Sequence, residues 1–360
     1  MPGIVGIIGP GVPGENVALL QRMLSPMLHE VFYSSGTSVD HAAGVFVGSV
    51  QADPAVATVL KWNERKDVGC LIVGENDPAA LIQLYEKLGT RALGKLNSWF
   101  SGVLVDLRGR KTILFNDRYG LHRVYVHQSG ERLFFSSEAK SLLAVLPDTR
   151  QIDPRGLAEW FSCGCVLQNR TLFSGIALLP AGSCWTFSPH GLVKERYFKP
   201  EDWESQPTLN PTAYGKRLEE TFPRILKRYF QGKRPMGMSL TGGLDGRMIM
   251  AWSLLGPGEL PCYTFNGPIR DCADVKIARR IARLCGQPHY TIPVGDEFFA
   301  QFPKLAAETV GITDGAMDVT GAVELYVNRL AREIAPVRIT GCMGNAGGNM
   351  ISPSFAYRLP

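Results

Sequence analysis

The chain has 360 residues, of which 45% are hydrophobic, and its formal net charge is +5. This length allows two domains, each with a core of ordinary size. The charge is mild and spread along the chain, so it gives no indication of nucleic acid binding. The sequence holds no run of 18 apolar residues and no charged segment followed by an apolar one at its start. We therefore expect no membrane span, no secretory signal and a cytoplasmic location.

The eight cysteines do not form a recognisable framework. Cys163 and Cys165 are the one close pair, and no Cys/His spacing of the zinc type occurs. We expect buried free thiols in a reducing compartment. His122, His127 and His190 have no acid–base partner nearby in the sequence and are interpreted as structural.

The first half of the chain is rich in short apolar runs separated by Gly, Asp and Pro, which is typical of antiparallel sheets. One helix is predicted at residues 17–28, with Pro26 near its end, and another at 78–88, where leucines recur at helical spacing. Strands are predicted at 44–50, 70–73, 102–106, 112–115, 123–127, 132–136 and 183–187.

A polar, proline-bearing stretch at 199–211 predicts a domain boundary. Asn210 and Pro211 suit the cap and first position of a helix, in which Pro223 predicts a kink or a break. Strands are then predicted at 236–240, 260–265, 289–293 and 337–340, and helices from about 246 and at 274–285, 297–310 and 320–333. Such alternation predicts a parallel sheet with helices on both faces and a ligand site at the carboxyl ends of its strands. The predicted division is a first domain at 1–200, a linker at 201–211 and a second domain at 212–360.

The most informative motif follows the first of these later strands. Thr241, Gly242 and Gly243 form a turn that ends in Asp245 at the start of a helix. Backbone amides freed by glycines at a helix N-terminus bind anions, and an aspartate there can hold Mg²⁺. The stretch resembles the pyrophosphate-binding loop of ATP pyrophosphatases and lacks the Gly-Lys-Ser/Thr of the Walker loop. The alternative is a simple Gly-Gly turn after a buried strand.

A resemblance to glutamine-dependent asparagine synthetases runs in order along about 250 residues. The opening Met-Pro-Gly-Ile-Val-Gly-Ile-Ile-Gly looks like that family's Met-Cys-Gly-Ile-Val-Gly-Ile-Phe-Gly. Further similar segments are residues 96–102, 116–121, 135–140, 171–176 and 179–182.

The resemblance implies a fold and a reaction. The first domain is expected to be an α+β, Ntn-hydrolase-like sandwich of two antiparallel sheets with helices. The second is expected to be an α/β parallel-sheet domain, ATP pyrophosphatase-like (adenine nucleotide alpha-hydrolase-like) and apparently truncated, because family members continue well beyond residue 360. In the family, an N-terminal Cys releases ammonia from glutamine, and the second domain forms an acyl-adenylate with ATP.

Four departures fall in the glutamine pocket that the resemblance implies. Pro2 replaces the nucleophilic Cys, and Val73, followed by Gly74 and Glu75, replaces the Asn whose amide helps to form the oxyanion hole. Asn97 stands where an Asp binds the α-amino group of glutamine. The His-Arg-Arg carboxylate clamp has no counterpart between residues 42 and 61. We therefore predict an inactive glutaminase with no catalytic residue at position 2.

The resemblance also predicts an ATP site with Mg²⁺ on Asp245. Its residues are Leu240, Thr241, Gly242, Gly243, Asp245, Gly246, Arg247, Thr264, Phe265, Asn266, Gly267 and Gly341. Gly246 replaces the closing Ser of the loop, and Arg247 offers a positive charge to phosphate. The acidic segment that supplies a further magnesium carboxylate in the family is missing from residues 342–346. His289 is predicted to be structural.

Two functions remain open at this stage. The first is an AMP-forming amide ligase that uses ATP, a small carboxylate or peptide, and ammonia or a substrate amine. β-Lactam synthetases and the ring-closing enzymes of lasso peptides resemble asparagine synthetases in this way. The second is a non-catalytic relative that binds nucleotide or a partner protein. An apolar face left open by a truncated second domain would predict a homodimer or a partner subunit.

Overall fold

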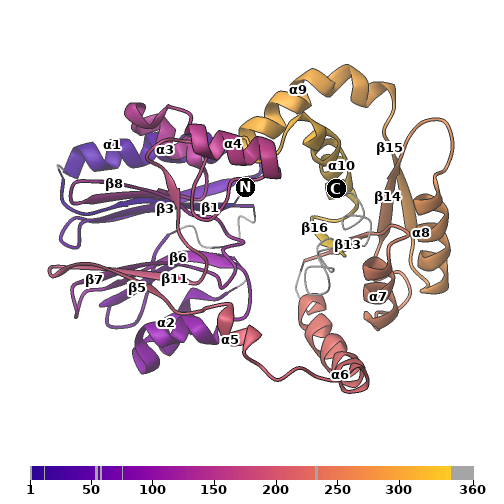
Figure 1. Cartoon of the computed structure of the whole chain (residues 1–360), viewed down its shortest axis with the longest axis horizontal. Coiled ribbons are helices and arrows are strands. Elements are labelled where there is room, and N and C mark those ends of the chain that lie inside the picture. Colours follow the sequence, from indigo (N-terminus) through magenta and orange to yellow (C-terminus); the bar gives the residue numbers. More distant parts are fainter. Residues whose placement is uncertain are drawn as a thin grey trace. The chain divides into compact units, whose positions relative to one another are not determined.

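The computed structural model describes residues 2–11, 13–52, 56, 59–74, 76–231 and 234–341. The chain forms two compact units (Figure 1). The first contains residues 1–206 together with the short segment 312–316, and the second contains residues 207–311 and 317–360. In the described part of the chain, none of the helices is both long and apolar enough to cross a membrane.

The first unit is built on two six-stranded sheets in which every pairing is antiparallel. The first sheet has the order β10-β8-β9-β1-β3-β2, with β1 (Gly3–Ile8), β2 (Ser34–Asp40), β3 (Val45–Gln51), β8 (Tyr125–Ser129), β9 (Arg132–Ser136) and β10 (Ala177–Leu178). The second has the order β12-β11-β7-β6-β5-β4, with β4 (Lys61–Trp62), β5 (Val68–Gly74), β6 (Phe100–Asp106), β7 (Lys111–Asn116), β11 (Ser183–Ser188) and β12 (Gly191–Arg196).

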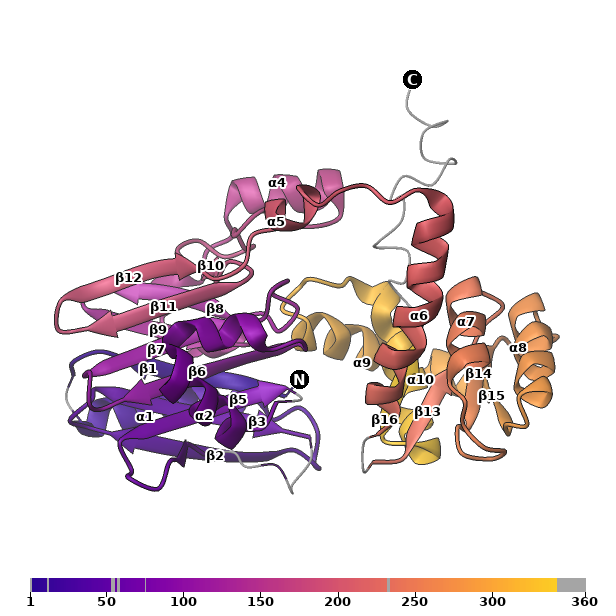
Figure 2. The same cartoon turned by 90° about the horizontal axis from the view of Figure 1, so that it is seen from below.

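The two sheets pack face to face and are covered by helices on their outer faces (Figures 1 and 2). Ile4 and Val47 of the first sheet share a buried core with Val73 and Val103 of the second. On the outer side of the first sheet lie α1 (Pro13–Leu24) and α3 (Ala139–Val145), and on that of the second lies α2 (Pro78–Leu88) with the 3₁₀ turn η2 (Gly89–Lys95). The predicted sandwich of two antiparallel sheets between helices is confirmed.

Several local predictions need correction. The first helix begins four residues earlier than predicted and ends at Leu24, and the 3₁₀ turn η1 (Ser25–Met27) follows it. Pro26 explains this ending, because proline lacks the N–H that another α-helical turn would use. The strand predictions missed β1, β2, β4, β10 and β12, and the helix predictions missed α3 and α4 (Pro154–Cys163). After the sheets, α5 (Glu201–Glu204) carries the chain toward the second unit.

The second unit is a four-stranded parallel sheet of order β15-β14-β13-β16, as predicted. Its strands are β13 (Met236–Ser239), β14 (Cys262–Asn266), β15 (His289–Pro293) and β16 (Val337–Thr340). One face packs against α7 (Leu244–Trp252) and α8 (Ala273–Leu284), and the other against α9 (Asp296–Ile312) and α10 (Ala322–Ile334), which the 3₁₀ turn η4 (Val319–Gly321) precedes. Figure 1 shows these two pairs of helices on opposite sides of the strands.

Helix α6 (Pro211–Phe230) opens the second unit. The Asn210 side chain caps it by accepting a hydrogen bond of 2.8 Å from the N–H of Ala213, which confirms the predicted start. The helix continues through Pro223, so a break there is wrong. Phe222 contacts the ring of Trp252 and Leu226 is buried, and this packing on both sides of the proline offsets the lost backbone hydrogen bond.

Candidate functional site

The predicted phosphate loop lies where β13 ends and α7 begins. Gly243 occupies the cap position of α7 and provides no side-chain cap, so the helix begins with unoccupied amide donors. Two amides of the turn are engaged within the loop itself: the N–H of Gly242 donates to Oδ1 of Asp274 at 2.9 Å, and that of Gly243 donates to Oγ1 of Thr241 at 3.3 Å. A carboxylate thus already lies where the motif predicts an anion.

The end of β16 packs against the first turn of α7. A Cβ added to Gly341 would lie 2.7 Å from the amide nitrogen of Gly246 and 2.8 Å from Cβ of Asp245. This close approach follows from the pairing of β13 with β16, which brings their carboxyl ends together. Asp245 is half-buried in the first turn of α7, and Arg247 is exposed.

The carboxylate of Asp245 is the predicted magnesium ligand. Among the described residues, no group of three or more His, Cys, Asp or Glu side chains is arranged to hold a metal ion. Residues 342–346, whose sequence lacks the acidic segment, lie outside the described residues. The support for Mg²⁺ is therefore one half-buried carboxylate beside a helix N-terminus.

The end of β14 supplies the predicted adenosine contacts. Thr264 is only 4% exposed, and its hydroxyl donates to the carbonyl of Leu240 at 2.6 Å and lies 2.9 Å from Nε2 of His289. This side chain ties three neighbouring strands together and is not free for a ligand. Phe265, by contrast, is 45% exposed.

Two further predicted residues follow Phe265. Asn266 stabilises its own turn by accepting from the N–H of Cys272 at 3.3 Å and donating to the carbonyl of Arg270 at 3.1 Å. Gly267 is exposed. The contact with Thr264 supports the structural interpretation of His289, and burial lowers the pKa of its imidazole.

In the first unit, the altered positions gather where β5 ends and β6 begins. Val73 pairs with Ser101 and Gly74 with Phe100. Gly74 has a φ of +133°, and a Cβ there would lie 2.3 Å from the carbonyl oxygen of Trp99, so this position requires glycine. Glu75 lies outside the described residues.

Two more of these positions belong to neighbouring segments. Asn97 is exposed in the connection before β6, and Asn76 donates a hydrogen bond to the hydroxyl of Ser98 in the same connection. Pro2 directly precedes β1, which lies against β5 and β6 across the sandwich.

His122 also lies in this region, through a contact that the sequence did not reveal. Its Nδ1 lies 3.1 Å from Oγ of Ser101, and its ring lies 5.5 Å from that of Trp99. Burial lowers the pKa of the imidazole to about 4, so the ring is neutral at pH 7. This contact with a serine hydroxyl is consistent with the structural interpretation of His122. Ser101 lies 21 residues earlier on β6, and no sequence spacing reveals such a contact.

Asp117 holds the turn that carries His122. Its carboxylate is fully buried and accepts hydrogen bonds from four backbone amides, those of Phe100 (3.3 Å), Tyr119 (3.0 Å), Leu121 (3.1 Å) and His122 (2.9 Å). The segment 116–121, which resembles a family motif, is therefore explained by folding rather than by catalysis.

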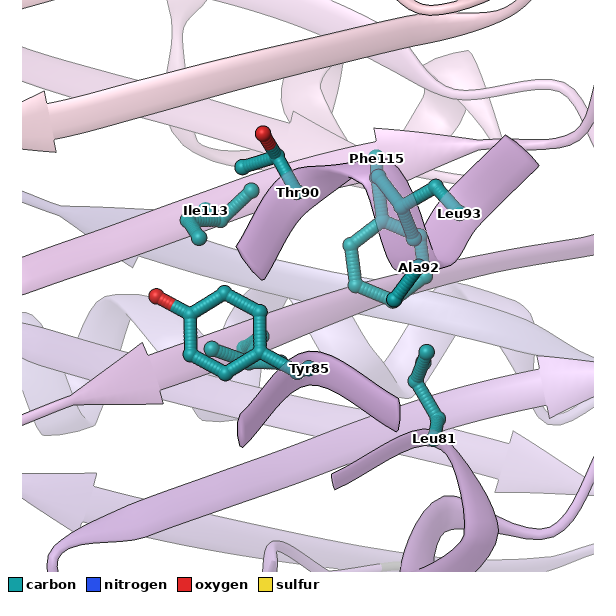
Figure 3. A pocket seen from close by; sticks show the side chains of 8 residues that line it. Leu81, Tyr85, Thr90, Ala92, Leu93, Ile113 and Phe115 are labelled. Carbon is teal, nitrogen blue, oxygen red and sulfur yellow. The ribbon is translucent and has the colours of Figure 1, made fainter. Parts of the chain in front are cut away.

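A small pocket lies beneath α2 and η2 (Figure 3). Its lining is Leu81, Tyr85, Thr90, Ala92, Leu93, Leu104, Ile113 and Phe115. The hydroxyls of Tyr85 and Thr90 are the only side-chain oxygens in this lining, and that of Tyr85 donates to Asp106 at 3.0 Å. Because the lining carries no charge, the pocket offers no means of recognising a nucleotide or an amino acid.

Comparisons with known proteins agree with the family resemblance. Residues 63–198 match the model of a glutamine amidotransferase domain. Asparagine synthetase 1 of Bacillus subtilis is 22% identical over 79% of this chain and 44% of its own length. Asparagine synthetase 3 of Arabidopsis thaliana is 23% identical over 85% and 52%, and a putative asparagine synthetase of Mycobacterium tuberculosis is 25% identical over 78% and 44%. The chain spans about half the length of these relatives.

Among solved structures, the glutamine phosphoribosylpyrophosphate amidotransferase of B. subtilis is similar over 80% of this chain and 65% of its own, with 12% identity and a TM-score of 0.37. This likeness is too low to support an argument about function. The names of these relatives include hydrolysis of glutamine, whereas this chain has Pro2 and Val73 at the positions where the resemblance implies Cys and Asn.

Proposed function

We propose that this asparagine synthetase-like chain is an ATP-dependent amide ligase that does not hydrolyse glutamine. A substrate carboxylate attacks the α-phosphate of ATP, and pyrophosphate leaves. Ammonia or a substrate amine then attacks the acyl-adenylate and releases AMP. The observation that carries the proposal is the glycine turn of 241–243 with Asp245, at the N-terminus of α7 and the carboxyl edge of a parallel sheet.

The residues around the turn fit a nucleotide with its metal ion. The amides of Gly242 and Gly243 would donate to phosphate oxygens once Asp274 and Thr241 release them. Asp245 would hold Mg²⁺, which neutralises the charge on the phosphates. Arg247 is exposed one turn into α7 and offers a further positive charge.

The glutaminase half lacks the groups that the reaction needs. Pro2 has no thiol, and attack by its secondary amine would give a stable amide instead of a labile thioester. Val73 is 2% exposed and apolar, so its side chain cannot donate to an oxyanion. Loss of one such donor alone typically costs about 100- to 1,000-fold in rate. Nitrogen would therefore reach the second unit as ammonia or as an amine.

The nucleotide site is tested by calorimetric titration with magnesium-ATP. We expect Asp245→Ala to abolish or strongly weaken binding while the protein stays folded. Asp296→Ala removes an exposed carboxylate from the first turn of a different helix and serves as the matched control. Unchanged binding in Asp245→Ala would exclude this site.

A second variant should change affinity in the opposite direction. Asp274→Ala frees the N–H of Gly242, so magnesium-ATP should bind several-fold more tightly. The reason is that the hydrogen bond from Gly242 to Asp274, worth about 1 kcal/mol, no longer competes with the phosphate for this N–H. Weaker binding in this variant would show that Asp274 holds the loop in its binding conformation.

A non-catalytic relative that binds nucleotide or a partner protein is the alternative, and the engagement of Gly242 by Asp274 favours it, because an amide that is already bonded is not available to the phosphates of a substrate. Exchange of labelled pyrophosphate into ATP, with aspartate and other small carboxylates as substrates, separates the two functions. Exchange dependent on a carboxylate supports the ligase, whereas binding of ATP without any exchange supports the alternative.

The glutaminase prediction has its own assay, the release of ammonia from glutamine. We expect neither the natural chain nor Pro2→Cys to turn glutamine over, because the thiol would still lack the oxyanion donor at position 73 and the carboxylate at position 97. Robust turnover by the natural chain would refute the proposal for this half. Turnover by Pro2→Cys would show that its pocket is intact.

A further inference from the structure

Two exposed thiols flank one glycine at the end of α4. Cys163 is the last residue of the helix, and Gly164 ends it in the left-handed conformation, with its N–H donating to the carbonyl of Trp160 at 2.9 Å. Cys165 follows directly. Both thiols are free and exposed, as is Cys272, so the expectation of uniformly buried cysteines was wrong.

The conformation of Gly164 brings the two cysteines close. Its φ of 71° and ψ of 5° form a compact turn. A compact central residue places the Cα atoms on either side of it about 5.5 Å apart, which is the commonest separation in disulfides, whereas an extended one places them roughly 7 Å apart, at the upper limit. Glycine adopts this left-handed turn without the strain that a Cβ would add.

The segment after Cys165 is folded back along α4. The carboxylate of Glu159 accepts hydrogen bonds from the N–H of Leu167 at 3.0 Å and from Nε of Arg170 at 3.1 Å. The bond to Arg170, with that to Leu167, lowers the pKa of Glu159 to about 2, so these contacts persist across the physiological pH range. Cys165 is thus held between a helix end and an anchored loop, and little chain entropy is left to lose on ring closure.

We propose that Cys163 and Cys165 are a reversible dithiol–disulfide pair whose oxidant is a small-molecule disulfide such as oxidised glutathione. One thiolate attacks the glutathione disulfide and releases one glutathione, giving a mixed disulfide. The second thiolate attacks the protein sulfur of that mixed disulfide and releases the other glutathione. The protein loses two protons and two electrons in all, and the two glutathione thiols receive them.

The other thiols of the first unit do not share this chemistry. Cys70 and Cys184 are buried, and burial raises the pKa of both, that of Cys184 to about 12. Neither forms thiolate at neutral pH, and a small disulfide cannot reach them.

A disulfide ring closed over the single residue Gly164 is strained, so the disulfide of Cys163 and Cys165 should be reduced more readily than a structural disulfide.

The test is peptide mass spectrometry of the full chain after equilibration with oxidised and reduced glutathione. Trypsin cleavage after Arg155 and Arg170 yields one peptide that holds both cysteines and no others. We expect this peptide to lose two hydrogens, without a glutathione adduct, and to recover with dithiothreitol. Cys272 is the internal control and should carry a single glutathione. Independent adducts on Cys163 and Cys165 would overturn the proposal.

Two variants sharpen the test. In Cys163→Ser, Cys165 should behave as Cys272 does and accumulate a glutathione adduct. Glu159→Gln weakens the anchor of the loop, and we expect several-fold less closed pair at the same glutathione ratio, with no change at Cys272. Glu201→Gln alters an exposed glutamate outside this loop and is the matched control. An unaltered closed fraction in Glu159→Gln would contradict the role of the anchored loop.

Discussion

Asp117 should be a main determinant of stability in the first unit, although it lies in the segment 116–121 that resembles a family motif. Its buried carboxylate accepts from four backbone amides and joins the start of β6 to the turn that carries His122. Replacement by alanine removes all four acceptors at once. Replacement by asparagine keeps one acceptor oxygen and places a donor in the position of the other.

The cost of Asp117→Ala follows from where the four donors lie. The N–H of Phe100 is at a fully buried strand start and stays unsatisfied, which costs about 1–3 kcal/mol. Tyr119 and Leu121 are exposed and His122 is half-buried, so water can reach that turn, and each of the three lost bonds there costs only about 0.5–1.5 kcal/mol. The sum is about 5 kcal/mol for alanine, and about half of that for asparagine.

Urea unfolding followed by tryptophan fluorescence measures this effect, because five of the six tryptophans lie in the first unit. With a slope of about 2–3 kcal/mol/M, the midpoint of Asp117→Ala should fall by roughly 1.5–2.5 M. Asp148→Ala, at an exposed position in another turn of the same unit, should change stability by less than about 0.5 kcal/mol. A loss below about 1 kcal/mol in Asp117→Ala would refute the reasoning.

Three further predictions concern stability. Burial lowers the pKa of His122 to about 4 from an ordinary 6.5, so between pH 4 and 6.5 only the unfolded chain takes up this proton. The stabilisation from the neutral imidazole is therefore complete above pH 6.5 and falls as the pH drops toward 4. In urea titrations at each pH, His122→Gln should lose about 2–3 kcal/mol less stability over that range than the natural chain. Asp314→Ala should lower the free energy of unfolding of the first unit by about 2 kcal/mol in the fluorescence assay, because the carboxylate accepts hydrogen bonds from the amides of Ala139 (2.7 Å) and Lys140 (3.1 Å) at the start of α3. A loss below about 0.5 kcal/mol would contradict this capping role. Gly341→Ala should destabilise the second unit by about 2 kcal/mol, since the new Cβ meets the backbone of α7; unaltered thermal unfolding by circular dichroism would show that the strand end can shift.

Local signals account for what the sequence predicted correctly. Helix α2 was predicted with its observed bounds from leucines at helical spacing, and the structure adds the local reasons for those bounds: Asp77 caps it, proline occupies its first position and Gly89 ends it. Strand β1 was missed because all six of its residues are buried and it shows no alternation. Helix α3 was missed for a tertiary reason: Glu138 does not cap it, and the capping carboxylate is that of Asp314, 175 residues further along the chain.

The same distinction holds for the candidate site. The glycine turn and Asp245 form a contiguous motif, so the sequence could identify them. The contact of Asp274 with Gly242 spans 32 residues, and that of Ser101 with His122 spans 21. The first engages a loop amide, and the second holds the ring of His122, whose pKa is lowered by burial. Neither could be inferred before the strands were placed.

The positions that depart from the family pattern in the first unit also show which matches to that pattern carry information about function. Pro2 precedes a strand and needs no ladder N–H there, while Val73 packs in the core between the sheets. Position 2 can therefore change at little cost to the fold, whereas the apolar side chain at position 73 contributes to the core. Gly74 matches the family pattern because a Cβ would meet the carbonyl of Trp99.

By the same reasoning, Gly242 and Gly341 are weak evidence for nucleotide binding. A Cβ at Gly242 would lie 2.9 Å from Asp274, and one at Gly341 would meet the first turn of α7, so packing alone explains both. Asp245 differs: it is half-buried, and within the described residues its side chain makes neither a hydrogen bond nor an ion pair that would explain its presence. A carboxylate in the first turn of a helix also stabilises the partial positive charge at that end, so its presence alone does not identify a ligand. The binding experiment with Asp245→Ala is therefore the decisive one for the second unit.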